Sequence, residues 1–236
     1  MTYCVAAAAS TGIVFCSDSR TNSGTADVST YAKMTLFESP GERVIVLLTA
    51  GNLATSQSVV TLLNERRSIM ALPTMYEAAA TVGATLREVM ARDADELSKS
   101  NIPAGASFIV GGQVRGEAPR LFLVYEQGNF IEATRETPYF QLGETHYAKP
   151  LLEAVLGFDI APGDAAKCVL LAMEATMRLN VAVGAPIDLL AYEKDQLRVT
   201  RRRRFEEGDA YLCAIGGLWS RGMHELCARA PAVEWS

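Results

Sequence analysis

The chain has 236 residues, of which 49% are hydrophobic and 21% charged, and its formal net charge is −5. This composition is typical of a globular protein, and the length predicts one domain over residues 1–236. The negative charge argues against a general nucleic-acid-binding protein, no apolar run approaches the roughly 20 residues of a membrane-spanning helix, and no secretory signal opens the chain, so we expect a cytoplasmic protein.

The N-terminal part of the chain is predicted to be mostly β structure. Two runs of strand-forming residues flank the turn Ser10-Thr11-Gly12, which indicates a hairpin that starts at the N-terminus. The run that holds Val44-Ile45-Val46-Leu47-Leu48 is typical of a strand buried on both faces. The predicted elements are, in order, strands at 3–9 and 13–17, a polar loop over 19–32, strands at 34–37 and 43–49, and a helix over 52–67.

A second helix is predicted to start at Thr74. Thr74 and Glu77 have the spacing of a capping box after Pro73, and apolar residues recur at helical spacing from Met75 to Leu97. Charged residues lie off this apolar stripe. The pattern indicates a surface helix that packs on a sheet.

The second half repeats the order of strands, helices and strands. We predict strands at 107–114, 120–125, 130–133 and 139–142, helices at 148–156 and after Pro162 with Asp164 as cap, strands at 187–192, 197–200 and 211–215, and a partly helical tail from 219. This order is neither strict β-α alternation nor all-β. Two antiparallel sheets packed face to face, with a helical pair outside each, satisfy it.

Cysteines and arginines add little chemistry by themselves. The five cysteines are scattered and mostly flanked by apolar residues, and no pair has zinc-ligand spacing, so neither a disulfide framework nor a metal site is predicted. The arginine run at 201–204 is followed at once by acidic residues. It favours a solvated face or a subunit contact over a phosphate-binding patch.

Five residues near the N-terminus could form one catalytic site: Thr2, Asp18, Arg20, Lys33 and Gly51. Four of them also have a structural interpretation by themselves: Thr2 as a small residue after Met, Asp18 as a turn residue that closes a strand, Lys33 as a solvated cation, and Gly51 as a strand-to-helix turn. Their joint spacing favours the chemical interpretation, in a chain whose predicted order of elements also fits.

The stretches at 15–20, 31–34 and 49–52 resemble the pattern of proteasome β-subunits and HslV. The opening Met-Thr-Tyr-Cys, the Ser-Asp-Ser-Arg-Thr-Asn segment at 17–22 and the Val-Gly-x-Pro-Ile-Asp-Leu stretch at 183–189 are most similar to the Anbu (ancestral β-subunit) family of bacterial proteasome-like proteins. The resemblance covers most of the chain and includes a C-terminal extension at about 205–236. It implies the α+β, four-layer αββα sandwich of N-terminal-nucleophile (Ntn) hydrolases, and self-association into a ring or an open helical array.

The chemistry of such a site follows from its groups. A threonine hydroxyl needs a base, and once Met1 is removed the α-amine of Thr2 is one. An ammonium at Lys33 disfavours protonation of that amine, Asp18 keeps Lys33 charged and in place, and Arg20 belongs to the same network. Gly51 lets a backbone N–H approach the reacting carbonyl and stabilise the oxyanion. No metal or organic cofactor is required.

Two departures from the family pattern affect activity. Glu144 stands where proteasome subunits and HslV have a Ser, and Arg178 or Asn180 stands where they have an Asp. Glu144 could accept a hydrogen bond from the α-amine, but its charge would raise the pKa of that amine and oppose Lys33. Retention of Met1 would convert the amine into an amide and remove the base.

We therefore expect an N-terminal threonine peptidase or amidase that acts on a peptide or protein substrate within a homo-oligomer. One alternative is a catalytically weak proteasome-like scaffold or binding subunit, and another is an Ntn amidase with a small-molecule substrate. The sequence does not indicate whether an ATP-dependent unfoldase docks. No nucleic-acid or membrane partner is expected.

Overall fold

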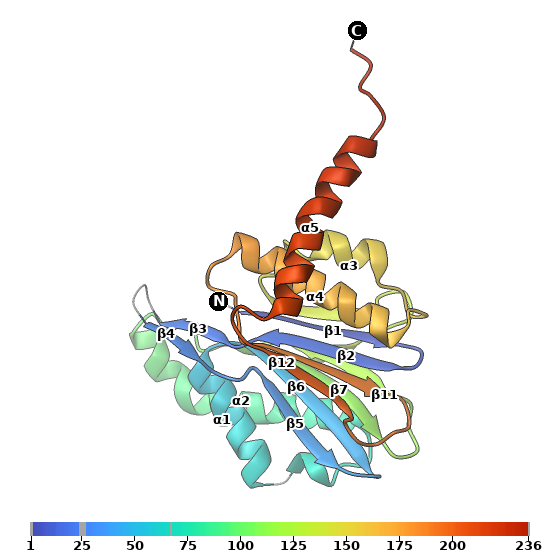
Figure 1. Ribbon diagram of the computed structural model, residues 1–236. Helices are drawn as coiled ribbons and strands as arrows, with labels where there is room; N and C mark the ends of the chain where they lie inside the picture. Colours follow the sequence, from blue (N-terminus) through green and yellow to red (C-terminus); the bar gives the residue numbers. More distant parts are fainter. Residues whose placement is uncertain (1, 24–26, 67, 236) are drawn as a thin grey trace.

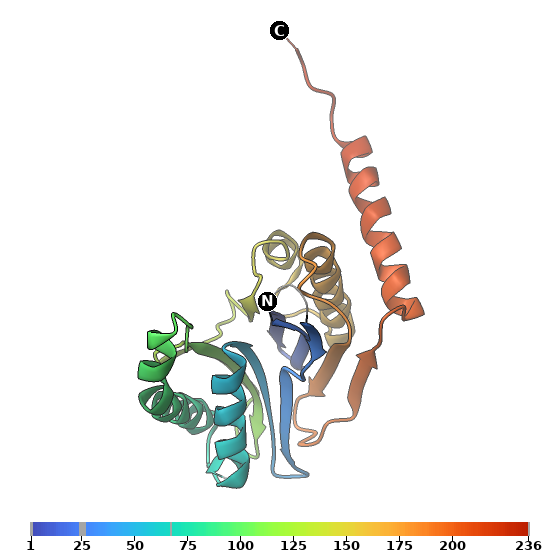
Figure 2. The ribbon, with the colours of Figure 1, turned by 90° about the vertical axis from the view of Figure 1, so that its left-hand side faces the viewer.

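The computed structural model describes residues 2–23, 27–66 and 68–235, and it shows two five-stranded antiparallel sheets packed face to face. Helices cover the outer face of each sheet, so that the body has four layers in the order helix, sheet, sheet, helix (Figures 1 and 2). The architecture is the predicted αββα sandwich. A fifth helix leaves the body and points away from it.

The first sheet contains the N-terminal hairpin at its centre. Alternate residues of this hairpin face different layers: Val14 and Cys16 pack against the helices, whereas Ile13 and Phe15 pack between the sheets. The sheet has the strand order β10-β1-β2-β11-β12. Its strands are β1 (Tyr3–Ala9), β2 (Gly12–Asp18), β10 (Tyr139–Gly143), β11 (Ile187–Glu193) and β12 (Arg201–Phe205).

The second sheet is built around β6, which is buried on both faces as its apolar run predicts. Val44 and Val46 pack between the sheets, and Ile45 and Leu47 pack against the helices. The strand order is β5-β6-β7-β8-β9, and β3 pairs with β4 in a separate ribbon. The bounds are β3 (Arg20–Ser23), β4 (Asp27–Thr30), β5 (Met34–Ser39), β6 (Arg43–Gly51), β7 (Ala106–Val114), β8 (Arg120–Val124) and β9 (Phe130–Glu132).

The helices start where the sequence places their caps, with one exception. The side chains of Asn52 and Thr74 accept the N–H groups of Thr55 and Glu77, each at 3.1 Å. Asp164 was expected to cap a helix but lies inside its first turn, because Ala161 occupies the cap position before Pro162. The helices are α1 (Leu53–Glu65), η1 (Ser68–Met70), α2 (Met75–Lys99), α3 (Lys149–Val155), α4 (Pro162–Leu179) and α5 (Ala210–Arg229).

Three predicted segments are wrong. The polar loop at 19–32 contains β3 and β4, whose polar residues lack the apolar alternation that indicates a strand. The segment at 197–200 is a connection, since the N–H of Val199 donates to Glu38 at 2.6 Å, and the arginine run forms β12 instead. The predicted strand at 211–215 is the start of α5, which Asp209 caps and which packs its apolar side against α4.

Within the described ranges, no helix is both long enough and apolar enough to cross a membrane.

Candidate functional site

The peptide group that joins Thr2 to Tyr3 lies at the start of β1 and is held on both sides. Its carbonyl oxygen accepts the backbone N–H of Glu144 at 2.8 Å, and its N–H donates to Asp18 Oδ1 at 3.0 Å. Gly143 lies directly beside it, at a φ of +80° where a Cβ atom would stand 1.8 Å from the Thr2 carbonyl oxygen. The backbone at Thr2 is therefore fixed by groups from two neighbouring strands, β2 and β10.

Asp18 and Lys33 form a buried ion pair next to this peptide group. Lys33 Nζ lies 2.7 Å from Asp18 Oδ1, which is the same oxygen that accepts the N–H of Tyr3. The side chains are 0% and 6% exposed. Burial raises the pKa of the Asp18 carboxyl, while the Lys33 ammonium and the N–H groups of Tyr3 and Gly184 act in the opposite direction. One carboxylate oxygen thus connects the lysine to the backbone at Thr2.

Arg20 belongs to the network in two ways. Its carbonyl oxygen accepts a second hydrogen bond from Lys33 Nζ at 2.7 Å, so the ammonium lies between this oxygen and Asp18 Oδ1. Its guanidinium donates to the carbonyl of Val181 at 3.1 Å and packs against Gly184, where a Cβ would lie 2.5 Å from Arg20 Cζ. The side chain therefore orients the loop after α4, and the backbone orients Lys33.

Gly51 ends β6 close to Lys33, which directly precedes β5. The N–H of Thr49, two residues earlier, donates to the Lys33 carbonyl at 3.0 Å. Gly51 has a φ of +104°, and a Cβ there would stand 2.5 Å from the carbonyl oxygen of Gly105, so this turn into α1 requires glycine. Gly51 was expected at the start of the helix but is the last residue of β6, directly before the cap Asn52, and its role toward a bound carbonyl stays a prediction.

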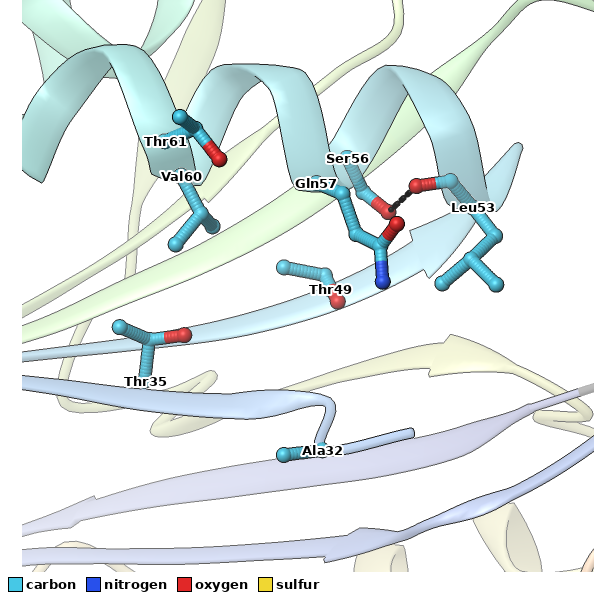
Figure 3. Close-up of a pocket in the computed structure, with 8 residues that line it drawn as sticks. All are labelled: Ala32, Thr35, Thr49, Leu53, Ser56, Gln57, Val60 and Thr61. Atoms are coloured by element: carbon cyan, nitrogen blue, oxygen red, sulfur yellow. Dashed lines mark hydrogen bonds between the residues drawn. The ribbon is translucent and has the colours of Figure 1, made fainter. Parts of the chain in front are cut away.

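A pocket of about 250 Å³ opens next to Ala32, the residue before Lys33 (Figure 3). Gln57 and Ser56 point from α1 toward Thr49 on β6, and Ala32 closes the opposite side. All eight lining side chains are uncharged: Ala32, Thr35, Thr49, Leu53, Ser56, Gln57, Val60 and Thr61. No local sequence pattern predicts this pocket, because it forms only where α1 lies against residues of β5 and β6.

The residues at the two departures from the family pattern have different positions. Glu144 lies beside Thr2 through its backbone N–H. Arg178 instead pairs with Glu174 at 2.9 Å and donates to the carbonyl of Gly216 on α5 at 2.8 Å. Asn180 accepts the N–H of Ala182 at 2.9 Å and so shapes the loop that Arg20 contacts. Arg178 is a helix–helix contact rather than a part of the site.

Asp188 is a buried carboxylate that our sequence reasoning did not single out. It lies on β11 directly opposite Ser17, next to the strand that ends in Asp18. Its Oδ2 accepts Ser19 Oγ at 3.1 Å and Arg204 Nη1 at 2.8 Å. A single acidic residue inside the apolar run of 187–192 was the available signal, since a buried charge in a strand needs a partner.

The arrangement holds a cation close to the peptide group after Thr2 with almost no exposure of that cation to solvent. Among the described residues, no three His, Cys, Asp or Glu side chains gather where they could bind a metal ion. Met1, whose removal the predicted chemistry requires, lies outside the described residues.

Two stacked antiparallel sheets between helical layers, with a buried lysine–carboxylate pair beside the second residue, define a protein of the proteasome-subunit class. The model of the family described as "Proteasome subunit" matches residues 2–190. Curated proteins give no match to the chain.

Solved structures give a more particular assignment. The chain is 42% identical to Anbu (ancestral beta-subunit) from Yersinia bercovieri, with a TM-score of 0.93 and 100% of each chain covered. It is 43% identical to an Anbu (Gly-1) mutant from Hyphomicrobium sp. strain MC1, with the same TM-score and coverage. The structure described as the helical assembly of the Anbu complex from Pseudomonas aeruginosa is 46% identical, with a TM-score of 0.93 over 99% of this chain and 98% of that one. The chain belongs to the Anbu family of proteasome-like proteins.

Proposed function

We propose that this protein is a threonine peptidase or amidase of the proteasome type, with Thr2 as nucleophile after removal of Met1. The observation that carries the proposal is the shared oxygen of Asp18, which binds Lys33 Nζ at 2.7 Å and the N–H that follows Thr2 at 3.0 Å. This oxygen keeps a buried ammonium beside the residue whose amine must act as base.

The reaction that we propose forms and breaks one acyl bond in two steps. The neutral α-amine of Thr2 takes the hydroxyl proton as Oγ attacks the carbonyl carbon of the substrate. The resulting oxyanion is stabilised by the N–H of Gly51. The amine returns the proton to the leaving nitrogen, which departs as an amine and leaves an ester on Thr2. Water then attacks the ester with the same base, which releases the acid and restores the hydroxyl.

Lys33 supports this chemistry through its charge. An α-amine has an ordinary pKa of about 7.7 to 8.0, and a neighbouring ammonium shifts it downward, so that more of the amine is neutral near pH 7. Asp18 and the Arg20 carbonyl hold the ammonium in place. Asp18 and Lys33 therefore act on the proton balance of the base.

The pocket next to Ala32 gives the proposal a substrate preference. Its uncharged lining of hydroxyl, amide and apolar groups fits an uncharged substrate side chain of moderate size. We further propose that residues 1–236 form one domain, with 205–236 as an extension, and that copies associate into a ring or an open helical array. The relative from Pseudomonas aeruginosa, described as a helical assembly, supports the association.

Intact-mass analysis tests the proposal. Purified protein should lack Met1 and gain the mass of one β-lactone or epoxyketone on Thr2. The variant Thr2→Ala should not be labelled, and Thr2→Ser should be labelled because it keeps a hydroxyl. Retention of Met1, or labelling that persists in Thr2→Ala, contradicts the proposal.

A second candidate function is a scaffold or binding subunit of low activity. It is favoured by the position of Arg178, which contacts α5 rather than Thr2, so that the described residues of α4 bring no second carboxylate to the site. For this candidate we expect that protein which has completely lost Met1 still assembles but shows neither labelling of Thr2 nor peptide hydrolysis.

A further inference from the structure

The pocket between β5, β6 and α1 has polar side chains on its sheet side and on its helix side. Thr35 lies opposite Leu47 in the pairing of β5 with β6. Thr49 comes two residues after Leu47, on the same face of β6, so it is the diagonal neighbour of Thr35 at roughly 7–8 Å. Facing this pair, α1 contributes Gln57 and Thr61 (Figure 3). We call this space the hydroxyl–amide pocket.

The polar side chains of the hydroxyl–amide pocket have hydrogen-bonding groups that the described part of the chain does not use. No side-chain hydrogen bond joins a described residue to Thr35, Thr49, Gln57 or Thr61. The hydroxyl of Ser56 differs, because it donates to a carbonyl of its own helix at 3.0 Å. Three hydroxyl groups and one carboxamide are therefore available to a ligand, and each of them can both donate and accept.

The backbone around the pocket is held in place on both sides. Thr49 is 8% exposed, its N–H donates to the Lys33 carbonyl at 3.0 Å, and its carbonyl accepts the Cys4 thiol at 3.6 Å. On the helix side, the Asn52 side chain caps α1 by accepting the N–H of Thr55 at 3.1 Å. A ligand therefore meets groups whose positions are already set, which favours one shape and one hydrogen-bonding pattern.

The lining also sets the charge and the size of what can enter. None of the described side chains that form it is charged, so a carboxylate or ammonium would lose water there without gaining an ionic partner. The volume of about 250 Å³ is below the roughly 300–1,000 Å³ of pockets that bury a whole drug-sized ligand, so it suits a single side chain. Ala32, Leu53 and Val60 provide apolar contacts for the methylene groups of that side chain.

The pocket lies next to the proposed reaction centre. Its lining includes Thr49 and Leu53, which stand two residues before and two residues after Gly51. In the proposed reaction the N–H of Gly51 binds the reacting carbonyl. The side chain nearest to the pocket is therefore that of the residue which carries this carbonyl.

We propose that the hydroxyl–amide pocket binds a side-chain carboxamide, so that glutamine or asparagine precedes the scissile bond, and that Gln57 determines this preference. The inference rests on the proposed function, since it names the substrate class for Thr2. The Gln57 carboxamide donates to the carbonyl of the substrate side chain and accepts one of its N–H groups, and a threonine hydroxyl accepts the other. An apolar side chain of the same size displaces water and leaves these groups without partners.

Hydrolysis of matched peptides tests the preference. The peptides are blocked at the N-terminus, carry a coumarin amide as leaving group, and differ only at the residue before it, which is glutamine, glutamate, methionine or lysine. Methionine has a similar length to glutamine but no strong donor or acceptor. The glutamine peptide should have a kcat/KM at least about tenfold above that of each other peptide.

Substitution of Gln57, an exposed residue, tests whether this side chain determines the preference. Gln57→Leu removes both hydrogen-bonding functions and should reverse the order, so that the methionine peptide is cleaved faster than the glutamine peptide. Gln57→Glu keeps the shape and adds a negative charge, so the kcat/KM of the lysine peptide should rise by about tenfold or more. Gln196→Leu changes an exposed glutamine outside the pocket lining and should leave the order unchanged.

Binding to a variant without the nucleophile separates this inference from the proposed function. Peptides of the same sequences that end in a plain amide are titrated into Thr2→Ala, and NMR line broadening gives their dissociation constants. The glutamine peptide should bind about tenfold more tightly than the methionine peptide. Adding Gln57→Leu to the same chain should reverse this order.

The outcomes distinguish the two proposals. A protein that hydrolyses no peptide but shows the glutamine preference in binding contradicts the proposed function and supports the carboxamide site. Hydrolysis with equal kcat/KM for the glutamine and methionine peptides, or a preference that Gln57→Leu leaves unchanged, overturns the carboxamide site and leaves the proposed function standing. Absence of both hydrolysis and binding overturns both.

Discussion

Asp18 and Asp188 lie on neighbouring strands of one sheet, and both are buried carboxylates that contact a cation. Asp18 binds Lys33 at 2.7 Å, and Asp188 binds Arg204 at 2.8 Å. The difference lies in the cations. The side chain of Lys33 is 6% exposed and lies beside the backbone at Thr2, whereas that of Arg204 is 37% exposed at the edge strand β12.

This comparison teaches that a buried carboxylate does not by itself mark a site. Asp188 accepts a hydrogen bond from the Ser19 hydroxyl and binds Arg204 of the edge strand β12, whose guanidinium is also in contact with water. Asp18 holds a cation that has almost no access to water and joins that cation to the backbone after Thr2. Removing a desolvated charge partner costs more than removing a solvated one, so the two pairs should respond very differently to substitution.

The largest effect is expected for Lys33→Met. The variant leaves the carboxylate of Asp18 buried without its ammonium, and the free energy of unfolding should fall by about 3–5 kcal/mol. Labelling of Thr2 should also be lost. Urea unfolding measures the first effect and intact mass the second. Asp18→Asn in the same chain should recover part of the stability without recovering labelling, and a loss below about 1 kcal/mol would break the comparison.

The pH dependence of Lys33→Met sharpens the same point. Burial already raises the pKa of Asp18 above its ordinary 3.8, and loss of the ammonium that lowers it raises the pKa further. Between the pKa of Asp18 in the unfolded chain, which is near the ordinary 3.8, and its higher pKa in the folded variant, the folded state binds more protons than the unfolded state. The stability of the variant therefore falls as pH rises through this window, by up to about 1.4 kcal/mol per pH unit. The gap to the parent protein should be wider at pH 8 than at pH 5 in parallel urea titrations. A constant gap contradicts this account.

A smaller effect is expected for Asp188→Asn. The substitution keeps the shape of the side chain but weakens the charge-assisted hydrogen bonds from Ser19 and Arg204. The free energy of unfolding should fall by about 1–3 kcal/mol. Labelling of Thr2 should fall far less than in Lys33→Met. Thermal unfolding and labelling rates measured on the same preparation check both statements, and complete loss of labelling would assign Asp188 a role in the site.

The smallest effect is expected for Arg204→Met. Water can replace the half-exposed guanidinium beside Asp188, so the free energy of unfolding should change by about 0–1 kcal/mol. Urea unfolding next to Lys33→Met gives a matched measurement, since both variants replace a cation by the same side chain. Equal losses in the two variants would mean that burial of the cation does not set the cost.

The parts that could be predicted from the sequence depend on local patterns. The hairpin β1–β2, the buried strand β6 and the caps of α1 and α2 follow from alternation, apolar runs and short-range capping residues. The pattern around Asp18, Lys33 and Gly51 could be recognised because these residues sit next to strand ends and turns. Errors arose where polar residues form strands, as in β3, β4 and β12, and where an apolar pattern suits helix and strand alike, as at the start of α5.

Periodicity and turn chemistry, which act over a few residues, predicted most of the elements and their order. The resemblance to proteasome-like proteins implied the αββα class and the candidate site residues around Thr2. The tertiary structure decided that one oxygen of Asp18 serves both Lys33 and the backbone after Thr2, that Asp188 is a partner of Arg204, and that Arg178 of α4 contacts α5. It also set the position of the pocket next to Ala32 and of α5, which leaves the body. These features join residues far apart in the chain, and their contacts depend on how the layers pack, which no local pattern encodes.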